Sequence, residues 1–160
     1  MTKTKKGIRR QNNGGYTITL RVYSSPSEWK SKNFKTYLNR KTAVDRRRFI
    51  NRRIALSYFR MLDMPYKTNT EINSILLSLP LKVRIVYFAI KASAKAERLN
   101  DRGVYLYHRV SSAEKAGLTM PYFLRYRTIL KKAGLLATKK INGDSYCYFP
   151  ERKQDPITDL

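Results

Sequence analysis

The sequence predicts an α+β fold that is mainly helical and carries a small antiparallel β-sheet. Three stretches, 42–62, 83–94 and 120–133, repeat apolar residues at spacings of three and four, which is typical of amphipathic helices. Asn142-Gly143 separates two strand-like runs and indicates a tight hairpin. A length of 160 residues suits one main core with extensions.

Residues 1–15 combine basic side chains with Gln, Asn and Gly. This composition offers little apolar surface to offset the entropy of ordering the chain. We therefore expect a flexible basic arm that binds phosphates through Lys5, Lys6, Arg9 and Arg10.

Residues 16–66 are interpreted as a basic N-terminal segment that contains a strand and an arginine-rich helix. Residues 16–23 alternate Ile18, Leu20 and Val22 with polar neighbours, which predicts a half-buried strand without an evident partner. Trp29 and Phe34 follow among lysines. Such aromatic residues either stack on bases or pack the segment against the rest of the protein, and we favour packing.

The predicted helix over residues 42–62 presents Ala43, Ile50 and Ile54 on one face. Its outer side is strongly basic, and few acids lie near enough to neutralise it. A charged face is often simply solvated, but with 34 Lys and Arg against 11 Asp and Glu in the whole chain we favour nucleic-acid contact. The residues that form this arginine row and its flank are Arg46, Arg53, Arg60, Arg48 and Arg52.

The main domain is predicted over residues 67–150. Residues 72–79 predict a short helix, and Val83 to Ala94 begin a long amphipathic helix that we expect to end near Asn100–Gly103. Residues 104–110 predict a short strand. Residues 151–160 are interpreted as a C-terminal tail.

Residues 111–134 predict two helices joined by a tight turn. Ser111 to Glu114 read as a capping box that starts the first helix, and Gly117 suits the left-handed position after its end. Thr119 is expected to cap the second helix, which runs to Ala133 and stops at Gly134.

The hairpin of residues 135–149 follows directly, through Gly134-Leu135-Leu136. With the preceding helices, this stretch resembles the winged helix-turn-helix family, in particular plasmid and phage replication initiators and regulators. The resemblance covers about residues 79–149. It implies that the second helix enters a DNA groove and that the hairpin is a wing.

Other functions find little support in the composition. The net charge of +23 implies an anionic partner, and no apolar run reaches the ~20 residues that a membrane span needs. Neither a nucleophile–base pair, a carboxylate pair nor a glycine-rich phosphate loop is visible, so we expect no enzyme, no cofactor and no metal site. His108 is interpreted as structural, and Cys147 as a buried thiol in a wing strand.

We therefore expect a weakly or fully sequence-selective protein that binds double-stranded DNA in replication initiation or transcription regulation. We place it in a bacterial or host cytoplasm, at the nucleoid, or in a virion. Arg125 can take a guanine bidentately, whereas lysines suit phosphates. The residues expected at the DNA from the second helix and the wing are Tyr122, Arg125, Thr128, Lys132, Lys139 and Lys140.

The alternative is a non-enzymatic structural protein. It would use the winged domain and the basic arm to bind nucleic acid and protein partners in a virion or in a replication or transcription complex, as a homo-oligomer or in a larger assembly. Met120, Tyr122 and Leu124 would suit protein contacts.

Overall fold

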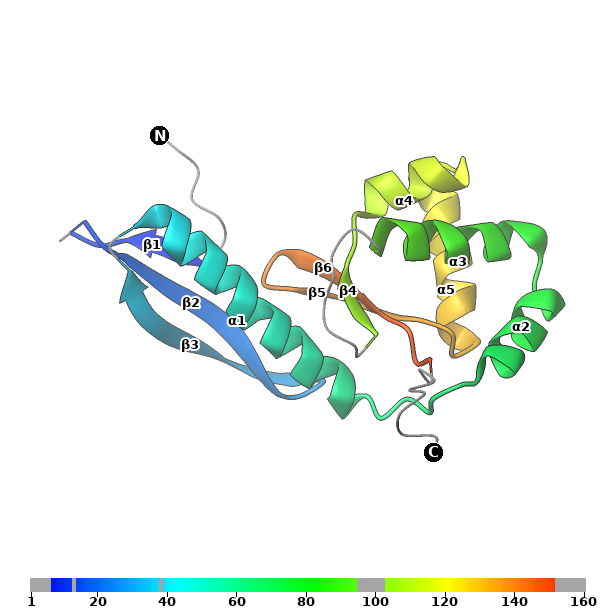
Figure 1. The fold of residues 1–160 in the computed structure, drawn as a ribbon, viewed down its shortest axis with the longest axis horizontal. Helices are drawn as coiled ribbons and strands as arrows, with labels where there is room; N and C mark the ends of the chain where they lie inside the picture. Colours follow the sequence, from blue (N-terminus) through cyan, green and yellow to red (C-terminus); the bar gives the residue numbers. More distant parts are fainter. Residues whose placement is uncertain (1–6, 13, 38, 95–102, 152–160) are drawn as a thin grey trace, which may run out of the picture. The chain divides into compact units, whose positions relative to one another are not determined.

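The protein is described by a computed structural model that covers residues 7–12, 14–37, 39–94 and 103–151. In these residues it forms helices and two three-stranded antiparallel sheets, which confirms the predicted α+β class (Figure 1). The chain divides into two compact units. Unit 1 comprises residues 1–63 and Lys140–Asp144, and unit 2 comprises residues 64–139 and 145–160.

Unit 1 is a three-stranded sheet with one long helix, α1, lying across one of its faces (Figure 1). The central strand, β2, alternates as predicted, and Ile18 and Leu20 are buried. Ala43, Ile50 and Ile54 of α1 are buried as well, as expected from their spacing. The elements are β1 (Ile8–Arg10), β2 (Tyr16–Ser25), β3 (Glu28–Tyr37) and α1 (Arg40–Met61).

Two of the three strands of this sheet were not predicted. Residues 8–10 pair with β2 and bury Ile8, so this part of the expected flexible arm is ordered β-structure instead. The break after Ser25 is a hairpin turn at Pro26-Ser27 that leads into β3, the missing partner of β2.

The arginine-rich helix is confirmed with slightly earlier bounds. The side chain of Asn39 caps it by accepting a hydrogen bond of 2.8 Å from the backbone N–H of Lys41. The helix ends at Met61, and Asp63 adopts a left-handed backbone (φ 49°) shortly after it. Pro65 then prevents any continuation.

Unit 2 packs its helices around an apolar core that includes Val86, Ile90, Phe123 and Leu130. Helix α3 lies against both α4 and α5, and the strands form a sheet in the order β4-β6-β5. The elements are α2 (Asn69–Ser78), α3 (Leu81–Ala94), β4 (Val104–Leu106), α4 (Arg109–Ala116), α5 (Met120–Lys132), β5 (Ala137–Ile141) and β6 (Asp144–Tyr148). The predicted end of the long helix, near residues 100–103, falls mostly outside the described residues.

The predicted capping box at Ser111 is wrong. Helix α4 starts three residues earlier, with His108 at the N-cap position and Ser111 inside the first turn. Ser112 is fully buried in this helix, where its hydroxyl faces the core and cannot cap the first N–H groups. Because of the same shift, Arg109 and Val110 belong to α4 and not to the strand that was predicted over residues 104–110. The observed strand, β4, ends at Leu106.

The signals that frame the second helix are confirmed. Gly117 has a left-handed backbone (φ 68°) at the end of α4, and Gly134 (φ 75°) follows α5. Thr119 occupies the N-cap position of α5, although its side chain makes no capping hydrogen bond. Both turns are therefore set by glycine conformations that other residues rarely adopt.

The hairpin β5–β6 is confirmed, with a two-residue loop at Asn142-Gly143. Both loop residues have positive φ (50° and 87°), as a type I′ turn requires. Its tip, Lys140–Asp144, belongs to unit 1 by its contacts, and the division of the chain falls after Asp63. The sequence instead placed this tip with the rest of residues 67–150.

Candidate nucleic-acid interface

Helix α5 carries one buried and one exposed face. Phe123 and Leu130 are fully buried and fix the helix on the core of unit 2. The predicted contact residues all lie on its exposed side, which leaves them accessible to a partner: Tyr122, Arg125, Thr128 and Lys132.

Neighbouring groups of α5 hold two of these side chains in position. The Arg125 guanidinium lies 5.8 Å from the centre of the Tyr122 ring, so the aromatic residue supports the cation near the start of the helix. The Thr128 hydroxyl donates a hydrogen bond of 2.9 Å to the carbonyl of Leu124. Its proton is thereby committed, and toward a ligand this hydroxyl is an acceptor.

Three further cations gather where the end of α5 approaches β5. Burial and the charges of Arg127 and Lys139 lower the pKa of Lys131. Arg127 donates to the hydroxyl of Tyr107 at 2.8 Å, which fixes its position. Sequence reasoning identified Lys139 but missed Arg127 and Lys131, because it weighed only the outward face of α5. A phosphate placed here would relieve the mutual repulsion of these charges.

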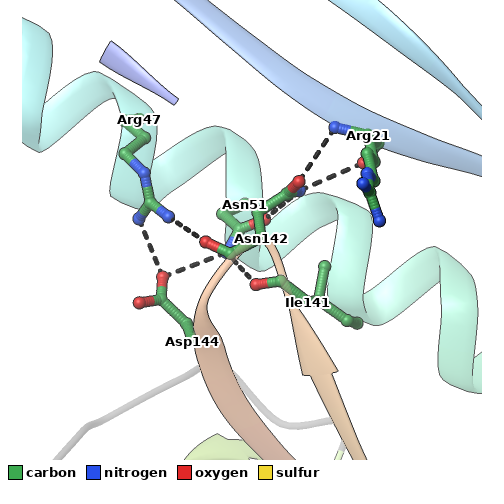
Figure 2. A network of polar contacts seen from close by, with 6 residues as sticks. All are labelled: Arg21, Arg47, Asn51, Ile141, Asn142 and Asp144. Carbon is green, nitrogen blue, oxygen red and sulfur yellow. Dashed lines mark hydrogen bonds and ion pairs between the residues drawn. The ribbon is translucent and has the colours of Figure 1, made fainter. Parts of the chain in front are cut away.

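The tip of the hairpin is engaged in a polar network within unit 1 (Figure 2). The guanidinium of Arg47, which is fully buried, donates to the Asp144 carboxylate at 2.8 Å and to the carbonyl of Asn142. Asn51 donates to the carbonyl of Ile141 and to Asp144, both at 3.0 Å. The turn is therefore a structural part of unit 1.

The Asn142 side chain completes this network by covering the edge that β2 leaves open beyond Ile18, where its pairing with the short strand β1 ends. Its amide oxygen accepts from the backbone N–H of Arg21 at 2.9 Å, and its amide nitrogen donates to the Arg21 carbonyl at 3.1 Å. A second amide hydrogen reaches Asn51 at 2.9 Å. One side chain thus pairs both backbone groups on the edge of β2, as a neighbouring strand would (Figure 2).

This network limits what the hairpin can contact. The predicted wing contacts, Lys139 and Lys140, lie in β5 rather than in the turn, and Lys140 is exposed whereas Lys139 is half-buried. The turn residues that would lead into a groove are occupied by Arg47, Asn51 and β2. Any nucleic-acid contact by the hairpin must therefore come from its strands.

The predicted arginine row is solvent-accessible on α1. Arg46, Arg53 and Arg60 are exposed, as is Arg48, while Arg52 is half-buried. Phe49 lies between two of them, with the guanidinium carbons of Arg46 and Arg53 at 5.0 Å and 5.8 Å from its ring centre. The row is therefore organised around an exposed aromatic ring.

The face of the unit 1 sheet opposite Ile18 and Leu20 is polar and basic. The register places Arg9 on this face beside Thr17, and Arg21 lies 3.9 Å from the ring centre of Trp29. Thr19 donates to the Asn33 side chain at 2.8 Å on the same face. Arg9 and Arg10 are both exposed strand residues, but the alternation of β1 places Arg10 on the face of Ile8 and not beside Arg9. Lys5 and Lys6 lie outside the described residues. Arg21 was not predicted as a nucleic-acid contact, because the sequence showed it only as one of the polar positions that alternate along a strand.

The two residues that were predicted to be structural, Cys147 and His108, lie in different surroundings. Cys147 is buried in β6, as expected, and burial raises the pKa of its thiol far above the usual range. His108 is exposed before α4, and its backbone N–H donates to the Ser93 hydroxyl at 3.4 Å. Within the residues described, no group of three or more potential ligands could hold a metal ion, and no helix has the length and apolar character that a membrane crossing demands.

Comparisons of the chain with protein-family models, with curated proteins and with solved structures found no match.

Proposed function

We propose that this protein binds double-stranded DNA as a winged-helix protein, in replication initiation or transcription regulation. The observation that carries the proposal is the way α5 is held in unit 2 and the face that it exposes. It follows a tight turn from α4, is fixed by Phe123 and Leu130, and exposes a face with cationic and hydrogen-bonding groups. Helix-turn-helix proteins place such a second helix in the major groove.

The exposed side chains differ in what they contribute. Arg125 lies in the second turn of α5, where helix-turn-helix docking brings residues to base edges, and its planar guanidinium can pair bidentately with guanine. Lys132 lies at the end of the helix and suits a phosphate. The cluster of Arg127, Lys131 and Lys139 adds positive charge beside that end.

Phosphate contacts of unit 1 would supply further affinity. The arginine row of α1 and the exposed Arg9 and Arg21 on the sheet give this unit two cationic surfaces. Such contacts release counterions from DNA and make binding depend strongly on salt without choosing a sequence. Selectivity would then rest on the base contacts of α5.

Binding-site selection with the purified protein, followed by competition titrations, tests the proposal. Arg125→Ala should cost about 1–3 kcal/mol on the selected duplex and much less on random duplex, while Lys132→Ala should weaken both alike. Arg109→Ala, which removes an exposed cation from α4, is the matched control and should leave the ratio of the two affinities unchanged.

Three results are decisive. Equal losses on both duplexes for Arg125→Ala would remove base reading and favour the structural, assembly-type function. No loss on either duplex would take α5 out of the interface. Failure to enrich any sequence, where specific binders prefer their site by ~10³-fold or more, would refute a sequence-selective regulator.

A further inference from the structure

Helix α3 is apolar on the face that points away from the core. Leu81, Ile85 and Phe88 are exposed by 62%, 39% and 57%, and Ala92 is exposed in line with them. Their spacing of four, three and four residues makes one stripe of about 16 Å along the helix. We call Leu81, Ile85, Phe88 and Ala92 the α3 stripe.

The opposite face of α3 is equally apolar, and all of its large side chains are buried. Val83, Val86, Tyr87 and Ile90 are buried against the rest of unit 2, including α4 and α5. A helix that is apolar all round is normally buried all round. The α3 stripe is therefore not needed for the core of unit 2, and its exposure requires a different explanation.

Cations border the stripe and no acid lies on this helix. The 3.6-residue repeat places Lys82 along one side of the stripe and Arg84 along the other. Within the described residues no carboxylate pairs with either of them, whereas Lys91 pairs with Glu151. Within the described residues, the apolar strip thus lies between an exposed lysine and a half-buried arginine that no carboxylate neutralises, and this arrangement matches a helix with an apolar seam flanked by Asp or Glu.

We propose that the α3 stripe docks an acidic amphipathic helix of a protein partner. The apolar side chains would supply most of the affinity, and the flanking charges would set register and reject basic partners. Two copies of this chain would instead face each other with cations on both borders and a net charge of +23 each, so self-pairing at the stripe is disfavoured. The proposal does not depend on the DNA-binding function.

The test uses the full-length protein and three labelled synthetic helices. The first has Leu at a and d positions and Glu at the flanking e and g positions, the second is a scrambled sequence of the same composition, and the third replaces Glu by Lys. Fluorescence anisotropy at physiological salt measures binding. The acidic amphipathic helix should bind at least about tenfold more tightly than the other two, because only it combines seam and charge.

Matched variants locate the site. Phe88→Ser, or Leu81→Ser as a second variant, should weaken binding of the acidic helix at least about tenfold. Phe49→Ser should not, although Phe49 is similarly exposed (47%) and also lies beside arginines. Lys82→Glu should reduce the preference for the acidic helix over the lysine version. An unchanged circular dichroism spectrum would show that each variant is folded.

Several outcomes would overturn the proposal. Equal binding of the acidic helix and its scramble means simple charge attraction, and equal losses in Phe49→Ser and Phe88→Ser mean that the stripe is not the site. A dimer in sedimentation equilibrium that Phe88→Ser abolishes assigns the stripe to a second copy. Loss of DNA binding in Phe88→Ser with an unchanged circular dichroism spectrum assigns the stripe to the nucleic-acid interface, and this result leaves the proposed function itself intact.

Discussion

Replacing Asp144 by Ala should destabilise unit 1 more than any surface substitution. Asp144 is the carboxylate that neutralises Arg47, whose side chain is only 1% exposed. Removing one partner of a buried ion pair costs about 3–5 kcal/mol, because the other charge remains buried and unpaired. Asp144 keeps 16% exposure and Arg47 keeps its bond to the Asn142 carbonyl, so we expect about 3 kcal/mol.

Urea unfolding followed by tryptophan fluorescence measures this loss with a probe that lies in unit 1. Trp29 is the only tryptophan of the chain and lies in β3 of that unit. With a slope of about 1–1.5 kcal/mol per molar urea, a loss of 3 kcal/mol lowers the midpoint by about 2–3 M. Urea is suitable because, unlike guanidinium chloride, it leaves the ion pair unscreened.

The control is Asp45→Ala, which removes an exposed acid from the same helix that carries Arg47 and should leave the midpoint almost unchanged. The double variant Arg47→Met with Asp144→Ala should be more stable than Asp144→Ala alone, since the buried cation that lost its carboxylate is gone as well. Equal midpoints for Asp144→Ala and Asp45→Ala would refute the reasoning. So would a double variant whose loss of stability equals the sum of the losses of Arg47→Met alone and Asp144→Ala alone.

Asn142→Ala should cost more stability in the same urea assay than Asn142→Gly, because glycine keeps the left-handed turn and loses only the side-chain bonds; equal costs would mean that the φ of 50° imposes no strain. Changing Arg46, Arg53 and Arg60 together to Gln should weaken binding to all DNA sequences and flatten the slope of log affinity against log salt by up to about 2.7; an unchanged slope excludes phosphate contacts of the row. Burial raises the pKa of the Cys147 thiol, so a disulfide reagent at neutral pH should modify it only when unit 2 opens; rapid labelling of the native protein would show that the thiolate is accessible.

Local signals predicted the helices and the hairpin of this chain well. Gly117 and Gly134 mark positions that need a left-handed backbone, and Asn142-Gly143 specifies a two-residue turn, so single residues determine these boundaries. The start of α4 was wrong because Ser111 and Ser112 form a cap motif in sequence while the helix buries Ser112. Burial cannot be read from a motif of four residues.

Pairings between distant residues could not be predicted. Strand β3 has no apolar alternation, since Lys30 and Lys32 are exposed at the edge of the sheet. Arg47 was not singled out from the sequence, although its position four residues after Ala43 and three before Ile50 places it on the buried face. That spacing was an available signal for a buried cation. Its partner Asp144 lies 97 residues away and has no local signature.

The assignment of the hairpin tip to unit 1 has a consequence for synthesis of the chain. A ribosome completes residues 1–63 well before it makes Lys140–Asp144, and at 5–20 residues per second the delay is roughly 4–16 s. During that time Arg47 lacks its carboxylate, and the Arg21 backbone on the edge of β2 lacks its partner Asn142. The nascent N-terminal region thus presents an open sheet edge to other chains, and a gene fragment cut after Asp63 would keep that edge open permanently.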